Sequence, residues 1–127
     1  MKFFYLALGG SIGATLRYLI SIFSLKYMAW GLPMGTLTAN LIGSFLIGFA
    51  FVFFGRDQIA INFKIFLFIG IFGSFTTFSS YMFESLEMFK NGFSKMAFLY
   101  IALSNIFGLL LVYLGYTIGE LFEKQMS

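Results

Sequence analysis

This chain of 127 residues is 60% hydrophobic and only 10% charged, with a mean hydropathy of +0.93. A composition this apolar excludes an ordinary soluble domain and indicates an integral membrane protein. The chain contains no cysteine and no histidine, which excludes disulfides, Cys-ligated metals and the most familiar general base. The net charge of +3 favours an anion over a cation as cargo, although basic membrane proteins are common.

Four apolar segments are long enough to cross a bilayer as helices, each of which needs about 20 residues. The first is too long for the apolar core of a signal peptide, so we expect it to be retained. Pro33 suits the first turn of the second. Without a linker or repeat between them, the segments form a single domain over residues 1–127. We expect the spans at about residues 3–25, 33–54, 62–89 and 94–122.

The third segment contains a run of glycines, hydroxyls and aromatic rings, GIFGSFTTFSSY, over residues 70–81. Non-helical backbone at membrane depth survives only where it is buried in protein or lines a cavity, because lipid offers no hydrogen-bond partner. The run therefore predicts a helix that is interrupted at its centre, and it is the first candidate for a functional site.

The charges outside the spans hardly select an orientation. Lys2, Arg56, Lys64 and Lys124 would lie on one side of the membrane, and Lys26, Lys90 and Lys95 on the other. Lys and Arg in short loops normally mark the cytoplasmic side. Four against three permits insertion both ways, and therefore an antiparallel homodimer. The alternative is that one loop charge dominates and all copies face one way.

Small residues four apart indicate where helices approach closely in lipid. We interpret these pairs as packing sites without chemistry of their own. They are Gly9 with Gly13, Gly10 with Ala14, Ala39 with Gly43, and Gly115 with Gly119.

Polar side chains inside the spans carry more information because burying them in lipid is costly. Arg17 must reach a partner or an aqueous vestibule, unless it snorkels to the interface. Asn40 either contributes hydrogen bonds to a site or joins two helices. In the fourth segment Tyr100 and Ser104 share a helix face with Gly108. This stripe either bridges helices or solvates an ion.

Acidic residues are rare and lie toward segment ends, at Glu84 and Glu87 and again at Glu120 and Glu123. A proton-coupled cation exporter would ordinarily place a carboxylate near the middle of the membrane. Amide N–H groups, hydroxyls and aromatic edges instead provide positive partners, which suit a compact anion.

Three motifs together resemble the Fluc (CrcB-like) fluoride channels. They are GGSIGATLRY at residues 9–18, GTLTANLIGSF at 35–45 and GSFTTFSSY at 73–81, and the likeness covers nearly the whole chain. The resemblance implies an all-α membrane protein of four helices, the third broken at its centre. It also implies an antiparallel dual-topology homodimer with two fluoride pores, placed as a multi-pass protein in the lipid bilayer of a bacterial inner membrane. Such a protein exports fluoride passively and reduces its toxicity, and is neither an enzyme nor a nucleic-acid binder.

The resemblance also assigns roles to single positions. Gly73 and Thr76 match the break whose backbone carbonyls, two from each subunit, hold a structural sodium ion that is not transported. Arg17 matches an arginine near the vestibule that raises the local anion concentration. The ion pathway is expected to include Asn40, Phe78, Ser79, Ser80, Tyr81, Tyr100 and Ser104.

Two positions depart from the family pattern. Tyr81 stands where a second pore phenylalanine is usual, and Gly108 stands where a third hydroxyl often continues the fourth-helix track. Either change leaves open a heteromeric pair in place of the homodimer. Outside the family, the alternatives are a small multidrug resistance exporter, which the missing first-helix glutamate disfavours, and an assembly factor without transport.

Overall fold

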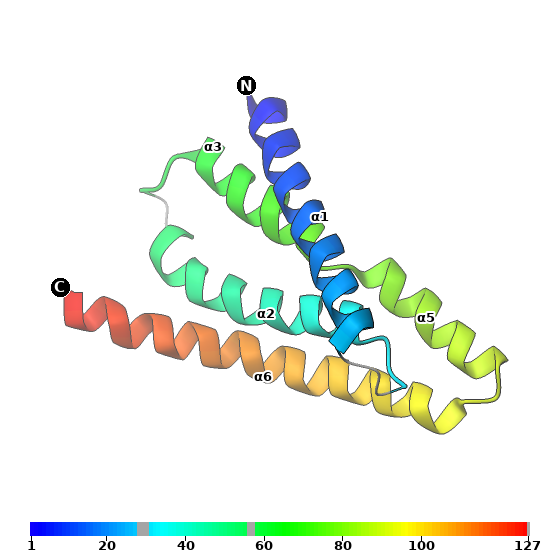
Figure 1. Ribbon diagram of the computed structural model, residues 1–127. Helices are drawn as coiled ribbons and strands as arrows, with labels where there is room; N and C mark the ends of the chain where they lie inside the picture. The colour runs from blue at the N-terminus through cyan, green and yellow to red at the C-terminus, as the bar shows by residue number, and fades with distance from the viewer. Residues whose placement is uncertain (28–30, 56–57, 127) are drawn as a thin grey trace.

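The protein is described here by a computed structural model covering residues 1–27, 31–55 and 58–126. Arg56, one of the charges compared above, lies outside these residues. The described part of the chain is helical between short turns (Figure 1). The elements are α1 (Lys2–Tyr27), α2 (Met34–Phe54), α3 (Ile61–Lys64), η1 (Ile65–Phe72), α4 (Gly73–Phe75), α5 (Phe78–Lys90) and α6 (Ser94–Met126).

In the described part of the chain, four helical stretches are long and apolar enough to cross a membrane, as the sequence predicts. They cover Lys2–Lys26, Met34–Phe54, Ile61–Lys90 and Ser94–Met126, with the third assembled from α3, η1, α4 and α5. The eight residues of η1 form a π-helical stretch, which the sequence did not predict. Wide turns of this kind are rare and often occur near functional sites.

α2 lies along α6, while α1 crosses the third span (Figure 1). Glycines permit both approaches. A Cβ atom on Gly9 would collide with the carbonyl oxygen of Phe66, and one on Gly48 with that of Val112. Gly13 and Gly115 meet backbone oxygens in the same way. Small residues therefore bring the backbones together, as expected for helices in lipid. Gly10 differs, because no described residue outside its own helix backbone comes within 4 Å of where its Cβ would be.

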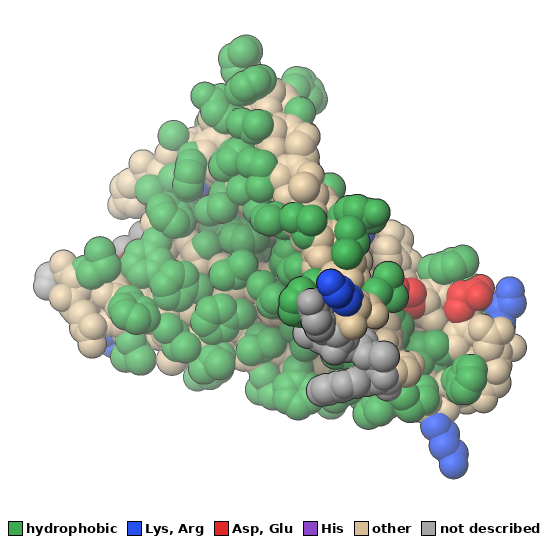
Figure 2. Space-filling model, viewed as in Figure 1, with side chains coloured by type: hydrophobic (Ala, Val, Ile, Leu, Met, Phe, Trp, Pro, Cys, Tyr) green, Lys and Arg blue, Asp and Glu red, His purple; other side chains and the backbone are tan. Residues whose placement is uncertain are grey.

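The subunit leaves most of its apolar side chains exposed, as the green surface of Figure 2 shows. Among the described residues, Leu37, Tyr81 and Tyr100 form a small buried hydrophobic cluster. Such exposure would be costly in water. It is compatible with lipid or a second protein surface covering these faces.

Candidate functional site

The third span is interrupted at two residues. Thr76 (φ −91°, ψ 159°) and Thr77 (φ −149°, ψ 126°) have extended backbone, so α4 ends before them and α5 begins after them. The Thr77 hydroxyl oxygen caps α5 by accepting a hydrogen bond from the N–H of Ser80, at 3.3 Å. The interruption predicted within residues 70–81 is therefore present and confined to one short stretch.

Asn40 of α2 pairs with the peptide groups of Thr77 through both ends of its amide. Its Oδ1 accepts from the Thr77 N–H at 2.8 Å, and its Nδ2 donates to the Thr77 carbonyl at 3.0 Å. Thr77 lies in the break as the N-cap of α5, so the Asn40 amide provides hydrogen bonds at a point where the helix is interrupted. One of the two Nδ2 protons is not needed for this pairing.

Arg17 of α1 reaches the preceding end of the break. Its Nε donates to the carbonyl of Ser74 at 3.1 Å, which satisfies an acceptor near the end of α4. The Ser74 hydroxyl in turn donates to the carbonyls of Gly10 and Gly70, at 3.0 and 2.6 Å. Arg17 thus has a protein partner inside the fold, and its effect on a vestibule stays a prediction.

The carbonyl oxygens of Gly73 and Thr76 differ from those of Ser74 and Thr77. Among residues 1–27, 31–55 and 58–126, no hydrogen bond reaches either oxygen. The carbonyls at the end of a helix remain open to water, to side chains or to a ligand. These two acceptors are therefore available to a cation.

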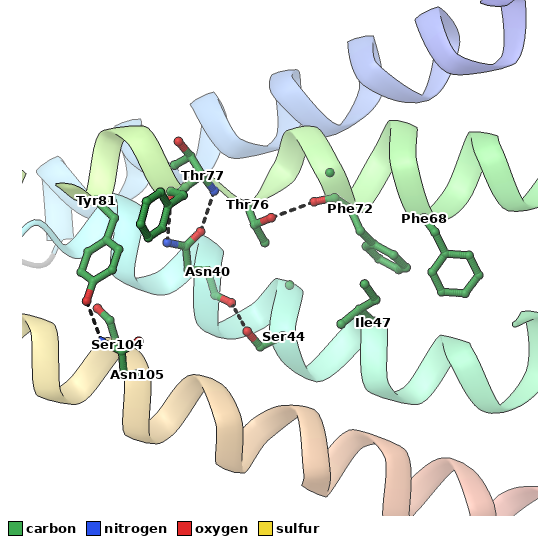
Figure 3. A pocket seen from close by; sticks show the side chains of 13 residues that line it. Asn40, Ser44, Ile47, Phe68, Phe72, Thr76, Thr77, Tyr81, Ser104 and Asn105 are labelled. Atoms are coloured by element: carbon green, nitrogen blue, oxygen red, sulfur yellow. Dashed lines mark hydrogen bonds between the residues drawn. The ribbon is translucent and has the colours of Figure 1, made fainter. Parts of the chain in front are cut away.

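A pocket of about 350 Å³ opens beside the break, between α2, the third span and α6 (Figure 3). It brings together Asn40, Phe78, Tyr81 and Ser104 of the predicted pathway, along with Gly73 and Thr76. Its remaining lining is Gly43, Ser44, Ile47, Phe68, Phe72, Thr77 and Asn105.

The other predicted pathway residues lie elsewhere. Ser79 and Ser80 line a separate pocket with Phe83 and Glu84. Tyr100 is fully buried, and its hydroxyl donates to Glu84 Oε1 at 3.0 Å. The structure therefore divides the predicted pathway between two places within one subunit.

Glu84 had no predicted role but has two hydroxyl partners. Besides Tyr100, the hydroxyl of Thr36 donates to its Oε2 at 3.0 Å. In the sequence, the one sign that Glu84 has a role is that this carboxylate lies within an apolar segment. The partners of Glu84 could not be predicted, since Thr36 lies 48 residues away along the chain.

Tyr81 and Ser104 use their hydroxyls differently. The Tyr81 oxygen accepts from Asn105 Nδ2 at 2.9 Å, and its O–H donates to the Ile101 carbonyl at 3.4 Å. Ser104 Oγ is buried and has no hydrogen-bond partner among the described residues. A buried hydroxyl without a partner is costly, so it is a candidate to bind water or an ion.

The pocket offers hydrogen-bond donors and aromatic edges rather than catalytic groups. Its lining includes Asn40, which has a second Nδ2 proton beyond the one used for Thr77, and also Ser104 and Phe78. No carboxylate is among its described lining residues. Over the described ranges, no group of three His, Cys, Asp or Glu residues could hold a metal. Such a lining can solvate a small anion through N–H, O–H and ring C–H groups.

Comparison with known proteins agrees with a lining that suits a small anion. The family model described as CrcB-like protein, Camphor Resistance (CrcB), matches residues 4–116. A protein of Parabacteroides distasonis, named fluoride-specific ion channel FluC, is 42% identical over 120 residues, which cover 94% of each chain. Proteins with the same name from Legionella pneumophila and Aquifex aeolicus are 43% and 38% identical, over 90% and 92% of this chain and 86% and 95% of theirs.

Proposed function

Since the chain belongs to the CrcB-like family, a family of bacterial membrane channels and not of enzymes, we propose that it conducts fluoride passively out of the cytoplasm and so reduces fluoride toxicity. The observation that carries the proposal is the donor-lined pocket at the break of the third span. The chain is a multi-pass membrane protein, and its described residues include four helices long and apolar enough to span the membrane. Conduction needs no titrating residue and no covalent step.

In this proposal, Asn40 and Ser104 provide hydrogen bonds that replace part of the water around fluoride, and the Phe78 ring presents a positive edge. Phe78 is 72% exposed in the isolated subunit, so its ring is accessible to an ion or to a second subunit. Weak contacts at several positions allow an ion to enter and also to leave.

We further propose the antiparallel dual-topology homodimer with two pores. The near-even loop charges support it, because they do not favour one orientation. The exposed apolar faces also support it, since a second copy would cover part of them. Ser79 and Ser80, which line a separate pocket within the subunit, would contribute to a pathway completed by that copy.

The proposed dimer would hold a structural sodium ion through the Gly73 and Thr76 carbonyls of both subunits. The donor set fits the ion, because hard cations bind backbone oxygens and these two accept no hydrogen bond from the described residues. Gly73 also leaves its surroundings open, since beyond the adjoining backbone the one described atom near a Cβ there is the Phe68 carbonyl oxygen, at 3.6 Å. Sodium would supply a positive centre that ties the two breaks together.

The test is fluoride efflux from liposomes that contain the purified protein, with a potassium ionophore to clamp the voltage. A fluoride electrode should record rapid loss of fluoride, and a parallel chloride measurement should show little loss. Folded protein that releases no fluoride, or releases chloride equally fast, would overturn the proposed function.

A further inference from the structure

Tyr81 joins α5 to α6 through a compact group of three polar atoms. Its side chain is only 6% exposed, and its oxygen lies 2.9 Å from Asn105 Nδ2 and 3.4 Å from the Ile101 carbonyl oxygen. Asn105 Nδ2 also donates to that same carbonyl at 2.9 Å. Each of the three groups therefore contacts the other two.

The Ile101 carbonyl determines the orientation of the Asn105 amide. A rotated amide would place Oδ1 next to the carbonyl oxygen, so that two acceptors faced each other. Nδ2 must therefore face both Ile101 and Tyr81. Consequently the Tyr81 oxygen acts as an acceptor for Asn105, and its own proton is directed to α6.

The ring of Tyr81 lies between two other aromatic rings. It makes edge contacts with Phe78, with centroids 6.0 Å apart, and with Tyr100, with centroids 5.2 Å apart. Tyr81 and Phe78 both line the pocket at the break. A rotation of the Tyr81 ring would therefore change the pocket wall and the support of Phe78 together.

We propose that Tyr81 and Asn105 are a matched pair of positioning residues for fluoride conduction; this inference rests on the proposed function. Asn105 holds the Tyr81 hydroxyl against α6, so that the aromatic ring is the part of Tyr81 that faces the ion pathway. With its hydroxyl bound by Asn105, Tyr81 presents only its ring to the pathway, as a phenylalanine would. The hydroxyl contacts α6 and does not bind the ion.

The pairing has an asymmetric consequence. If Asn105 is replaced by an apolar residue, the oxygen of Tyr81, a residue that is only 6% exposed, loses its donor. If both polar groups are removed, neither is left without a partner, and the change should be nearly neutral. Opposite outcomes for the single and double variants therefore identify a pair.

The experiment compares four proteins: the unchanged chain, Tyr81→Phe, Asn105→Leu and the double variant. Fluoride efflux per folded protein in liposomes is measured beside the thermal unfolding midpoint in detergent. Asn105→Leu should slow efflux about tenfold, and Tyr81→Phe should change it by less than about threefold. Adding Tyr81→Phe to Asn105→Leu should restore efflux to about the Tyr81→Phe rate.

A matched control removes the hydroxyl of a tyrosine that belongs to α6 and is not part of the pair. Tyr113 is 70% exposed and lies outside the lining of the pocket, so Tyr113→Phe should leave efflux unchanged. A purely structural role for the pair would move the unfolding midpoints while leaving efflux per folded protein at the unchanged rate.

The outcomes separate this proposal from the proposed function. No fluoride efflux from the unchanged protein would overturn the function, while non-additive midpoints would still establish the contact between Tyr81 and Asn105. Normal efflux with additive effects of the two substitutions would overturn the pair and leave the function intact. A large loss with Tyr81→Phe alone would show that the hydroxyl acts on the ion, which also contradicts the proposal.

Discussion

Asn40 supports the fold with part of its amide and leaves another part for the proposed contact with an ion. Its Oδ1 and one of its two Nδ2 protons fill the hydrogen-bonding needs of Thr77. The second proton remains for the pocket that Asn40 lines. From the sequence, Asn40 was expected either to join two helices or to contribute to a site. The amide can do both, because it has an acceptor oxygen and two N–H donors.

Asn40→Asp should abolish fluoride efflux, with a loss of at least about tenfold. The carboxylate can still accept from the Thr77 N–H, but it cannot donate to the Thr77 carbonyl and it repels an anion. Liposome efflux with a fluoride electrode measures the effect. Asn62→Asp, the same change in α3, is the control and should retain efflux. Undiminished efflux from Asn40→Asp would remove the ion contact assigned to the amide.

At the level of elements, the broken third span is stabilised from both neighbouring helices. Arg17 of α1 donates to Ser74 before the break, and Asn40 of α2 pairs with Thr77 after it. The Thr77 hydroxyl caps α5. An interruption that would be expensive in lipid is tolerated because side chains replace the lost helical hydrogen bonds.

Arg17→Met should lower the free energy of unfolding by about 1–3 kcal/mol, because the Ser74 carbonyl loses its donor in a partly buried place. Chemical denaturation in detergent measures this loss. Arg17→Lys is the matched control, since it retains the positive charge without the guanidinium geometry. If Lys preserves efflux while Met reduces it, the charge raises the local anion concentration. If both variants unfold as readily as the unchanged protein, Arg17 does not stabilise the break.

At the scale of the whole molecule, Gly73 has open surroundings within the subunit. A substitution there can therefore test assembly of the proposed dimer without preventing a single subunit from folding. Among the described residues, and apart from the adjoining backbone of its own helix, only the Phe68 carbonyl oxygen lies within 4 Å of a Cβ placed there. Gly48 is the opposite case, because a Cβ there would collide with the carbonyl of Val112 on α6. Substitution of Gly73 therefore tests assembly of the proposed dimer, while substitution of Gly48 tests folding of the subunit.

Gly73→Val should dissociate the proposed dimer while leaving the helical subunit folded, because the added side chain has room within the subunit but would stand at the proposed dimer centre, beside the carbonyls proposed to bind sodium. Light scattering in detergent measures the mass of the particle, and circular dichroism measures the helix content. In contrast, Gly48→Val should reduce the amount of folded subunit itself. A Gly73→Val protein that remains a dimer of normal mass would contradict the proposed role of the break at the dimer centre.

The sequence alone determined the features that depend on local composition. Four apolar runs fixed the number of spans, because a bilayer requires a helix of a certain length. The glycines and hydroxyls of residues 70–81 identified the interruption, and the three motifs identified the family. Each of these properties can be read from neighbouring residues without knowing how the helices pack.

Only the tertiary structure decided which groups meet. Asn40 and Thr77 are 37 residues apart, and Arg17 and Ser74 are 57 apart. Tyr81 and Asn105 are separated by 24 residues. Their pairing directs the Tyr81 hydroxyl, a departure from the family pattern, to α6. Such contacts depend on the crossing and rotation of whole helices, which small residues permit but do not uniquely specify. The same packing places Ser79 and Ser80 away from the pocket that Asn40 lines.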